Sequence, residues 1–336
     1  MYSREEIIDC FGNRSSSPCP LNSQPPNPPK KSESSDNSQL NVCSYNFEFY
    51  SYKHHKHLLP GQLQVNGNCI EQCRIAHNNV IGVARFIQNV LNHEPLNGTT
   101  PQYTCSINCV ETFGQREWTN AAWLDKREQV IFGQRMVNGQ LCSLAVAQDL
   151  VAHEFFHGLT YQMIGLEYYG QSGALDESYA DIFGILVANF QNSDLGTWNW
   201  EIGKGFGDNG QAIRSLSNPT IYGQPEHMKD YHSLPESEDH GGVHYNSGIH
   251  NKAAYYLLSS QDNQGNYLFD ATSGSQLFYL ALIQLSRQSV FSDSRRAIQQ
   301  VARTLFRRDS SRVEKLRAIA TAFDKVGIGD NIGIFE

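Results

Sequence analysis

The segment 153–157 reads His-Glu-Phe-Phe-His, with two histidines four residues apart and a glutamate directly after the first. On an α-helix, residues four positions apart differ by about 40° in azimuth, so both imidazoles can point at one metal ion. The alternative is two surface histidines that flank a glutamate in an ordinary helical pair. The preceding residues, 145–152, are good helix formers. This context places the motif within a helix and favours metal binding by His153 and His157.

A third metal ligand must come from another part of the chain, because catalytic zinc usually has three protein ligands and keeps its fourth position for water. Glu177 is the candidate, since it lies on the next expected helix after a loop long enough for the chain to reverse. Asp181 follows by one helical turn on the same face, where it could accept the free ring N–H of a ligating histidine. A solvated helix carboxylate is the alternative interpretation of Asp181.

The elements expected around this motif divide the chain into a β-rich part and a helical part. Strand signals occur after Tyr45 and at 103–107, 118–123 and 129–132. Apolar residues at helical spacing predict helices at 76–91, 144–164, 172–190, 248–259, 275–286, 292–306 and 312–326. We expect an α+β fold with a β-rich lobe at 44–150, followed by the metal-binding helix and a helical lobe at 151–336. Residues 1–43, largely Ser-, Pro- and Asn-rich, are expected to be a tail outside these lobes.

The composition excludes several classes of protein and partner. With 336 residues, of which 40% are hydrophobic and 18% charged, the chain can form a sizeable core and is neither fibrous nor wholly disordered. The net charge of −8 provides no basic surface for nucleic acid or an anionic membrane. No apolar run approaches the roughly 20 residues that span a bilayer, and the N-terminus lacks a signal-peptide core. We expect a monomer, either cytoplasmic or exported by a route without a recognisable signal peptide.

Five collinear motifs resemble the thermolysin-like zinc metalloendopeptidases. The run 153–157 with Glu177 and Asp181 resembles the zinc site of that family. Similar segments occur at 120–123, 214–219, 239–249 and 322–328, and the resemblance extends from about residue 59 to residue 328. It implies a thermolysin-like fold with one catalytic Zn²⁺ on His153, His157 and Glu177.

The resemblance also implies the roles of the residues around the metal. Glu154 would take a proton from the attacking water and later deliver it to the leaving amine. Tyr168 and His244 would stabilise the oxyanion, with Asp239 orienting His244. The expected substrate-binding residues comprise a group that contacts the peptide backbone (Asn120, Ala121 and Arg214) and apolar walls of a specificity pocket (Leu141, Leu144, Leu150, Ile202, Phe206 and Ile213). These walls predict cleavage of proteins or peptides on the N-terminal side of bulky hydrophobic residues.

The sequence departs from the family pattern at a calcium site. Many relatives bind calcium beside the active site through clustered acidic residues. Asp149 and Glu201 remain here, but the other positions are Ala188, Asn199 and Lys204. Because calcium needs six to eight oxygen ligands, we expect this double site to be absent. Near the zinc ligands, Asp176 replaces the more usual asparagine beside His157, which predicts an altered zinc affinity.

The short N-terminal extension resembles that of the protealysin-like branch, in which residues 1–43 would be a brief propeptide. The proline-rich signature of that propeptide is not recognisable here. Cysteines spaced four apart, Cys69 with Cys73 and Cys105 with Cys109, could form disulfides, remain free thiols or bind a second zinc ion. Cys10 or Cys19 acting as a thiol latch on the catalytic zinc is a further alternative.

Three other functions remain as alternatives to an active endopeptidase. An enzyme acting on peptide N-termini would need an acidic anchor near 120–123, and that segment has none. A zinc-stabilised binding module would have no use for Glu154, Tyr168 and His244 together, because structural zinc sites are closed. A catalytically latent zymogen would retain the whole site.

Overall fold

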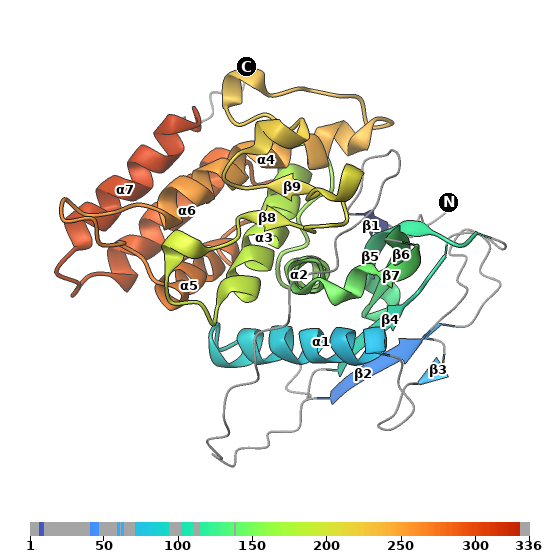
Figure 1. Cartoon of the computed structure of the whole chain (residues 1–336). Coiled ribbons are helices and arrows are strands. Elements are labelled where there is room, and N and C mark those ends of the chain that lie inside the picture. Colours follow the sequence, from blue (N-terminus) through green and yellow to red (C-terminus); the bar gives the residue numbers. More distant parts are fainter. Residues whose placement is uncertain are drawn as a thin grey trace, which may run out of the picture.

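The computed structural model describes residues 7–9, 41–46, 59–60, 62–63, 71–93, 102–110, 115–137 and 139–329. The run at 13–40 and the cysteines Cys10, Cys19 and Cys69 lie outside these residues. Two layers are visible in Figure 1: a sheet with helix α1 (Glu71–Asn89) beside it, and a group of helices on the other side of α2 (Gln148–Met163). The architecture is α+β, as predicted.

The sheet has seven strands in the order β1-β5-β6-β4-β2-β3, with β7 paired to β6. Strand β4 runs parallel to β2 and β6, and the other pairs are antiparallel. The strands are β1 (Ile7–Asp9), β2 (Asn41–Asn46), β3 (Gln62–Leu63), β4 (Gln102–Ile107), β5 (Trp118–Leu124), β6 (Gln129–Val137) and β7 (Gln140–Ser143). Thus a segment near the start of the chain lies at the sheet edge next to β5.

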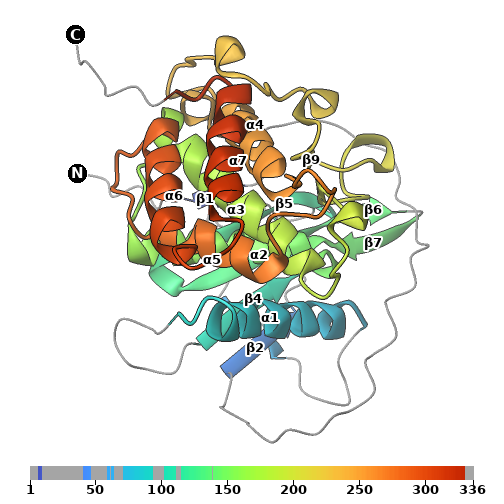
Figure 2. The same ribbon diagram turned by 90° about the vertical axis from the view of Figure 1, so that its left-hand side faces the viewer.

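The helical lobe follows α2 and is built around α3 (Gly170–Asn189). Figure 2 shows the later helices stacked on one side of α2 and α3, away from the sheet. They are α4 (Asp239–Leu258), α5 (Ala271–Leu282), α6 (Phe291–Leu305) and α7 (Arg312–Lys325). A two-stranded sheet, β8 (Glu201–Ile202) with β9 (Arg214–Ser215), lies between α3 and α4 in sequence. Among the described residues, no helix is sufficiently long and apolar to cross a membrane.

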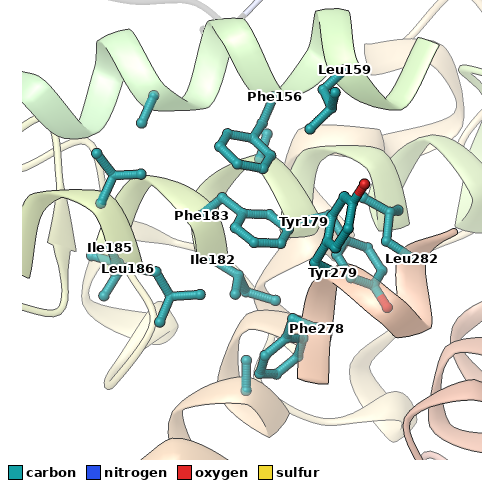
Figure 3. Close-up of a cluster of buried hydrophobic side chains, with 14 of the residues drawn as sticks. Phe156, Leu159, Tyr179, Ile182, Phe183, Ile185, Leu186, Phe278, Tyr279 and Leu282 are labelled. Carbon is teal, nitrogen blue, oxygen red and sulfur yellow. The ribbon is translucent and has the colours of Figure 1, made fainter. Parts of the chain in front are cut away.

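An aromatic pair joins the two central helices. Phe156 of α2 and Phe183 of α3 are buried and stack with ring centroids 4.0 Å apart and an interplanar angle of 9°. Figure 3 shows Phe156 above Phe183, with Tyr179 beside Phe183 and Ile182 and Phe278 below it. Burial of one phenylalanine stabilises the fold by about 1.5–3 kcal/mol. This core therefore holds α2 and α3, and the ligands they carry, in a fixed relative position.

Two glycines permit close packing, one between α2 and β5 and the other between β6 and β5. At Gly158 a Cβ atom would lie 2.7 Å from ring carbons of Trp123, so α2 rests directly on β5. At Gly133 a Cβ would lie 1.7 Å from the carbonyl oxygen of Trp118. The pairing of β5 with β6 shifts register between Trp118 and Ala121, and Gly133 faces this irregularity. Such irregularities, or β-bulges, change the direction of side chains and are common next to active sites.

Several expectations differ from the structure in their bounds. Helix α4 begins at Asp239, not at 248, and it contains a non-helical stretch, His240, Gly241 and Gly242, with φ of 47°, 85° and 86°. The expected divisions after residues 43 and 150 fall within β2 and α2.

Among the described cysteines, Cys105 and Cys109 are buried free thiols. Burial raises the pKa of the Cys105 and Cys109 thiols. Of the alternatives for this pair, free thiols agree with the structure, and no described cysteine belongs to a group that could hold a metal.

Candidate active site

The three expected metal ligands converge, as their placement on two packed helices requires. The Nε2 atoms of His153 and His157 lie 3.0 Å apart. The carboxylate oxygens of Glu177 lie 3.5 Å from each of them. Within the described part of the chain, these residues form the only group of three His, Cys, Asp or Glu side chains that could hold a metal ion. All three side chains are fully buried.

This donor set fits zinc. Ligand bonds of about 2.0–2.1 Å in a tetrahedron place neighbouring ligand atoms a little over 3 Å apart, which is close to the separations here. In addition, Glu177 Oε2 is buried without a hydrogen-bond partner. A buried carboxylate whose two oxygens each face an imidazole nitrogen is costly unless a cation lies between these groups. Two histidines and one carboxylate also leave a fourth position open for water.

Carboxylates orient the outer faces of both imidazoles. Asp181 lies 2.9 Å from Nδ1 of His153, and Asp176 lies 3.4 Å from Nδ1 of His157. These contacts direct the Nε2 atoms towards the metal position. Burial alone would lower the pKa of His153, but the neighbouring carboxylates of Asp181 and Glu177 raise that pKa to about 10. A proton on His153 therefore competes with a metal ion for this site.

Asp181 also receives bonds that the sequence did not predict. Arg214 donates to both of its oxygens, at 2.9 and 2.7 Å, and Asn251 Nδ2 donates at 2.9 Å. Burial would raise the pKa of Asp181, but the Arg214 guanidinium and His153 hold it well below its ordinary value. The two Arg214 nitrogens thus bind Asp181, so Arg214 orients a partner of the metal ligand. No local pattern links 181, 214 and 251, because the contact exists only after α3, β9 and α4 pack together.

The expected oxyanion residues, Tyr168 and His244, both lie close to the metal ligand Glu177. Tyr168 donates from its hydroxyl to Glu177 Oε1 at 2.5 Å and lies 3.3 Å from His244 Nε2. Asp239 Oδ1 lies 2.5 Å from His244 Nδ1, and its Oδ2 accepts the backbone N–H of Tyr245. The sequence prediction that Asp239 orients His244 agrees with this geometry.

Glu154 lies on α2 between the two histidine ligands in sequence and is fully buried. It is not one of the three converging ligands. A buried carboxylate that is adjacent in sequence to a metal ligand but outside the ligand set is a candidate for proton transfer.

The expected substrate edge is strand β5. Asn120 and Ala121 are buried, and the Asn120 side-chain oxygen accepts the backbone N–H of Ala121 at 2.9 Å. Strand β1 pairs antiparallel with the next residues of β5, with Ile7, Ile8 and Asp9 opposite Leu124, Trp123 and Ala122. The edge of β5 therefore accepts an added strand, and part of it is paired with the chain itself.

Four of the six expected pocket residues surround Gly203. A Cβ there would lie 2.2 Å from Ile213 Cδ1 and 3.4 Å from Leu150 Cδ1. Ile202 precedes this glycine, and Phe206 donates its backbone N–H to the Gly203 carbonyl at 2.9 Å. The other two lie on the chain leading to α2: Leu144 is buried, and Leu141 is half-buried on β7.

A buried arginine that the sequence did not single out supports this loop. Arg135 of β6 donates to the carbonyl oxygens of Phe206 and Gly207, at 2.5 and 2.9 Å. Arg135 thus connects the sheet to the loop that carries the pocket wall.

Comparison with known families agrees with this geometry. The model of the thermolysin metallopeptidase catalytic domain matches residues 46–161, and that of the thermolysin metallopeptidase alpha-helical domain matches residues 164–328. The chain belongs to the thermolysin metallopeptidase family.

Similar proteins include bacillolysin of Bacillus amyloliquefaciens, 33% identical over 276 residues that cover 79% of this chain and 48% of the relative. A zinc metalloproteinase of Listeria monocytogenes is 34% identical over 263 residues, 75% of this chain and 45% of the relative. The chain thus spans about half the length of these curated relatives. A solved structure of the precursor of protealysin, a metalloproteinase from Serratia proteamaculans, matches with a TM-score of 0.69 and 26% identity, covering 89% of this chain and 91% of that chain.

Within this thermolysin metallopeptidase, the remaining acidic residues of the expected calcium region bind protein groups. Asp149 Oδ2 accepts the backbone N–H of Gly203 at 2.8 Å. Glu201 Oε1 accepts the Tyr222 hydroxyl at 2.9 Å, and its other oxygen lies 3.5 Å from Lys204 Nζ. An ammonium group therefore lies beside one of the two retained carboxylates.

Proposed function

We propose that this protein is a zinc-dependent endopeptidase. The observation that carries the proposal is the convergence of His153, His157 and Glu177 on one position, with the buried Glu154 next to His153 in sequence on the same helix. Bound there, zinc would lower the pKa of a water molecule and polarise the scissile carbonyl. A closed structural site would have no role for the neighbouring Tyr168 and His244.

The protein groups around this position account for the proton transfers. Glu154 takes the proton of the attacking water and passes it to the leaving nitrogen. The same carboxylate thus acts first as a general base and then, once protonated, as a general acid. Tyr168 and His244 donate hydrogen bonds to the negative charge that develops on the carbonyl oxygen. Asp239 accepts from Nδ1 of His244, so that Nε2 faces the substrate. Each donor lies within reach of Glu177, and therefore of the metal position.

The substrate in this proposal is an extended peptide that adds to the edge of β5. The backbone of Asn120 and Ala121 would pair with the peptide, and the apolar walls around Gly203 would receive a bulky side chain after the cut. We infer cleavage on the N-terminal side of residues such as Leu or Phe. A peptide with blocked termini distinguishes this activity from that of an exopeptidase, which needs a free terminus.

Cleavage of a blocked internal peptide tests the proposal. The chain should cleave a peptide with Phe after the scissile bond at least tenfold faster than the same peptide with Asp there. A zinc chelator should abolish the activity, and added zinc should restore it. Activity that survives complete zinc removal would overturn the proposal.

A latent zymogen is the second candidate, and one observation favours it. Strand β1 pairs antiparallel with β5 at residues next to Asn120 and Ala121, where a substrate strand would continue. In the zymogen hypothesis, residues 1–43 act as a propeptide and compete with the substrate for the edge of β5. Proline cannot donate to a strand ladder, so Ile8→Pro in the full chain should weaken β1 pairing and increase cleavage of the blocked peptide several-fold. Equal activity of parent and Ile8→Pro would contradict latency through β1.

We also propose that the calcium double site is absent. Asp149 and Glu201 already accept hydrogen bonds from Gly203 and Tyr222, and Lys204 lies beside Glu201. Calcium in the millimolar range should leave the unfolding temperature unchanged. A calcium-dependent increase that Glu201→Gln removes would contradict this proposal.

A further inference from the structure

The side chain of Tyr168 is surrounded by three imidazole rings. Its ring centroid lies 6.5 Å from that of His157, 6.2 Å from that of His244 and 5.3 Å from that of His240. His157 is a metal ligand, and His244 bonds to Asp239. His240 is the nearest of the three, yet the proposed mechanism gives it no role. Its ring meets the Tyr168 ring at 62°, an edge-to-face arrangement that is favourable at about this separation.

The backbone of His240 is unusual in a way that points to function. Its φ is 47°, in the left-handed region that residues other than glycine rarely adopt. His240 directly follows Asp239, which has a φ of 49°, and it precedes two glycines with φ of 85° and 86°. Asparagine and glycine adopt this conformation more readily than most residues, so the position does not require histidine for its backbone. An unfavourable backbone beside an active site is a reason to look for a function of the side chain.

Tyr168 also lacks dense packing on another side. A cavity of about 530 Å³ lies next to it, lined by Leu166, Glu167, Tyr168, Asp176 and neighbouring residues. Tyr168 is on the short connection between α2 and α3, which is fixed to the helical lobe by the Glu167 N–H donating to the Arg287 carbonyl at 2.7 Å. A residue next to a cavity depends on its remaining neighbours to hold its side chain in place.

We propose that His240 is a positioning residue: its ring packs edge-to-face against Tyr168 and holds the Tyr168 hydroxyl where it can donate to the developing oxyanion. The inference rests on the proposed endopeptidase function. His240 acts through Tyr168 and needs no contact with the substrate or the metal. Its effect is on the rate of the chemical step and not on binding of the peptide.

The test compares His240→Asn with His240→Phe in the form of the chain that cleaves the blocked peptide. Asparagine tolerates the left-handed backbone but has no ring, whereas phenylalanine keeps a ring. His240→Asn should lower kcat about three- to tenfold with little change in KM, and His240→Phe should retain most of the parental kcat. Zinc content and unfolding temperature of each variant show whether the site remains intact.

A double-mutant cycle with Tyr168→Phe decides between action through Tyr168 and any other role. If His240 acts through the Tyr168 hydroxyl, His240→Asn should change kcat by less than twofold in the Tyr168→Phe background. An equal loss of kcat in both backgrounds would overturn the proposal, and so would a normal kcat for His240→Asn.

A second readout does not depend on activity. NMR of ring-labelled tyrosine in the zinc-loaded protein should show faster ring flipping of Tyr168 in His240→Asn than in the parent or His240→Phe. Unchanged flipping would contradict the packing role. If the parent itself fails to cleave the peptide, the endopeptidase proposal fails, whereas this comparison still tests the positioning by His240.

Discussion

At the residue scale, Asp181 connects the metal position to the surrounding helical lobe. It is fully buried and binds His153, Arg214 and Asn251. One carboxylate therefore orients a metal ligand and neutralises a buried guanidinium. Its substitution should affect both zinc binding and folding.

We predict that Asp181→Asn weakens zinc binding about 10–100-fold, the usual effect of removing a carboxylate partner of a ligating histidine. It should also lower the free energy of unfolding by about 3–5 kcal/mol, because the charge of Arg214 is left uncompensated. Competition with a zinc-binding dye and urea unfolding measure the two effects. Asp230→Asn removes the same charge at an exposed position and should change neither. Parental zinc affinity in Asp181→Asn would contradict the role of this carboxylate.

A second buried histidine predicts a pH dependence of stability. His250 lies between Ser178 and Ser294, 2.8 and 2.9 Å from their hydroxyls. Burial lowers its pKa from 6.5 to about 3. Between these two values the unfolded chain binds a proton that the folded chain does not, so stability decreases as the pH falls from 6.5 towards 3.

The His250→Gln variant should therefore show a flatter pH dependence than the parent. Well below pH 6.5, the difference in slope should approach about 1.4 kcal/mol per pH unit in the free energy of unfolding. Urea unfolding at pH 7, 6 and 5 measures it, with exposed His232→Gln as the control that keeps the parental slope. Equal slopes for all three proteins would show that His250 titrates alike in both states.

The sequence could identify residues whose relation is local or matches a family pattern. His153 and His157 are one helical turn apart, and the periodicity of α2 is enough to predict that they converge. The bond between Arg214 and Asp181 could not be predicted from spacing, because it joins residues on separately packed elements. His240 resembles an ordinary turn residue in sequence, and only the fold shows its ring against Tyr168.

At the element scale, the contact between α2 and β5 positions the metal ligands relative to the proposed substrate edge. Gly158 lies one residue after the ligand His157 and faces the Trp123 ring. Helix α2 can approach β5 this closely because no side chain separates them. The contact thus sets the distance between the metal position and a bound peptide.

We predict that Gly158→Ala destabilises the protein by about 1–3 kcal/mol despite the higher helix propensity of alanine, because the new methyl group overlaps a buried ring. The rate at which this variant cleaves the blocked peptide should also fall, because α2 must move away from β5. Gly82→Ala in α1 is the matched control: there a Cβ would meet only the end of the Gln148 side chain at 2.7 Å, which can move aside. Gly82→Ala should be neutral or stabilising. Similar stability losses in both variants would contradict the proposed contact.

The type of most elements followed from the hydrophobic pattern, whereas some boundaries did not. Helices α5, α6 and α7 begin and end within a few residues of the predicted ranges, because their apolar faces pack on α3 and α4. Helix α4 was predicted too short, since its Asp-His-Gly-Gly start has the composition of a turn and does adopt left-handed backbone angles. The pairing of β1 with β5 had no signal, because it joins segments more than a hundred residues apart through only three residue pairs.

At the scale of the whole molecule, the active site belongs to neither lobe alone. The sheet provides the proposed substrate edge through β5, and the helical lobe provides Glu177, Tyr168 and His244 (Figure 1). Helix α2 lies between them and carries His153, Glu154 and His157. Because both lobes contribute to the site, destabilising either lobe should abolish the activity of the whole protein.

The most direct measurement is cleavage of the blocked Phe peptide by Glu154→Gln, with zinc content determined on the same sample. This substitution keeps the size of the side chain but removes its ability to accept the water's proton. The account predicts full zinc occupancy with kcat reduced by about a hundredfold to ten-thousandfold, whereas Glu314→Gln on the exposed face of α7 keeps the parental rate. Parental activity of Glu154→Gln would contradict the proposed mechanism.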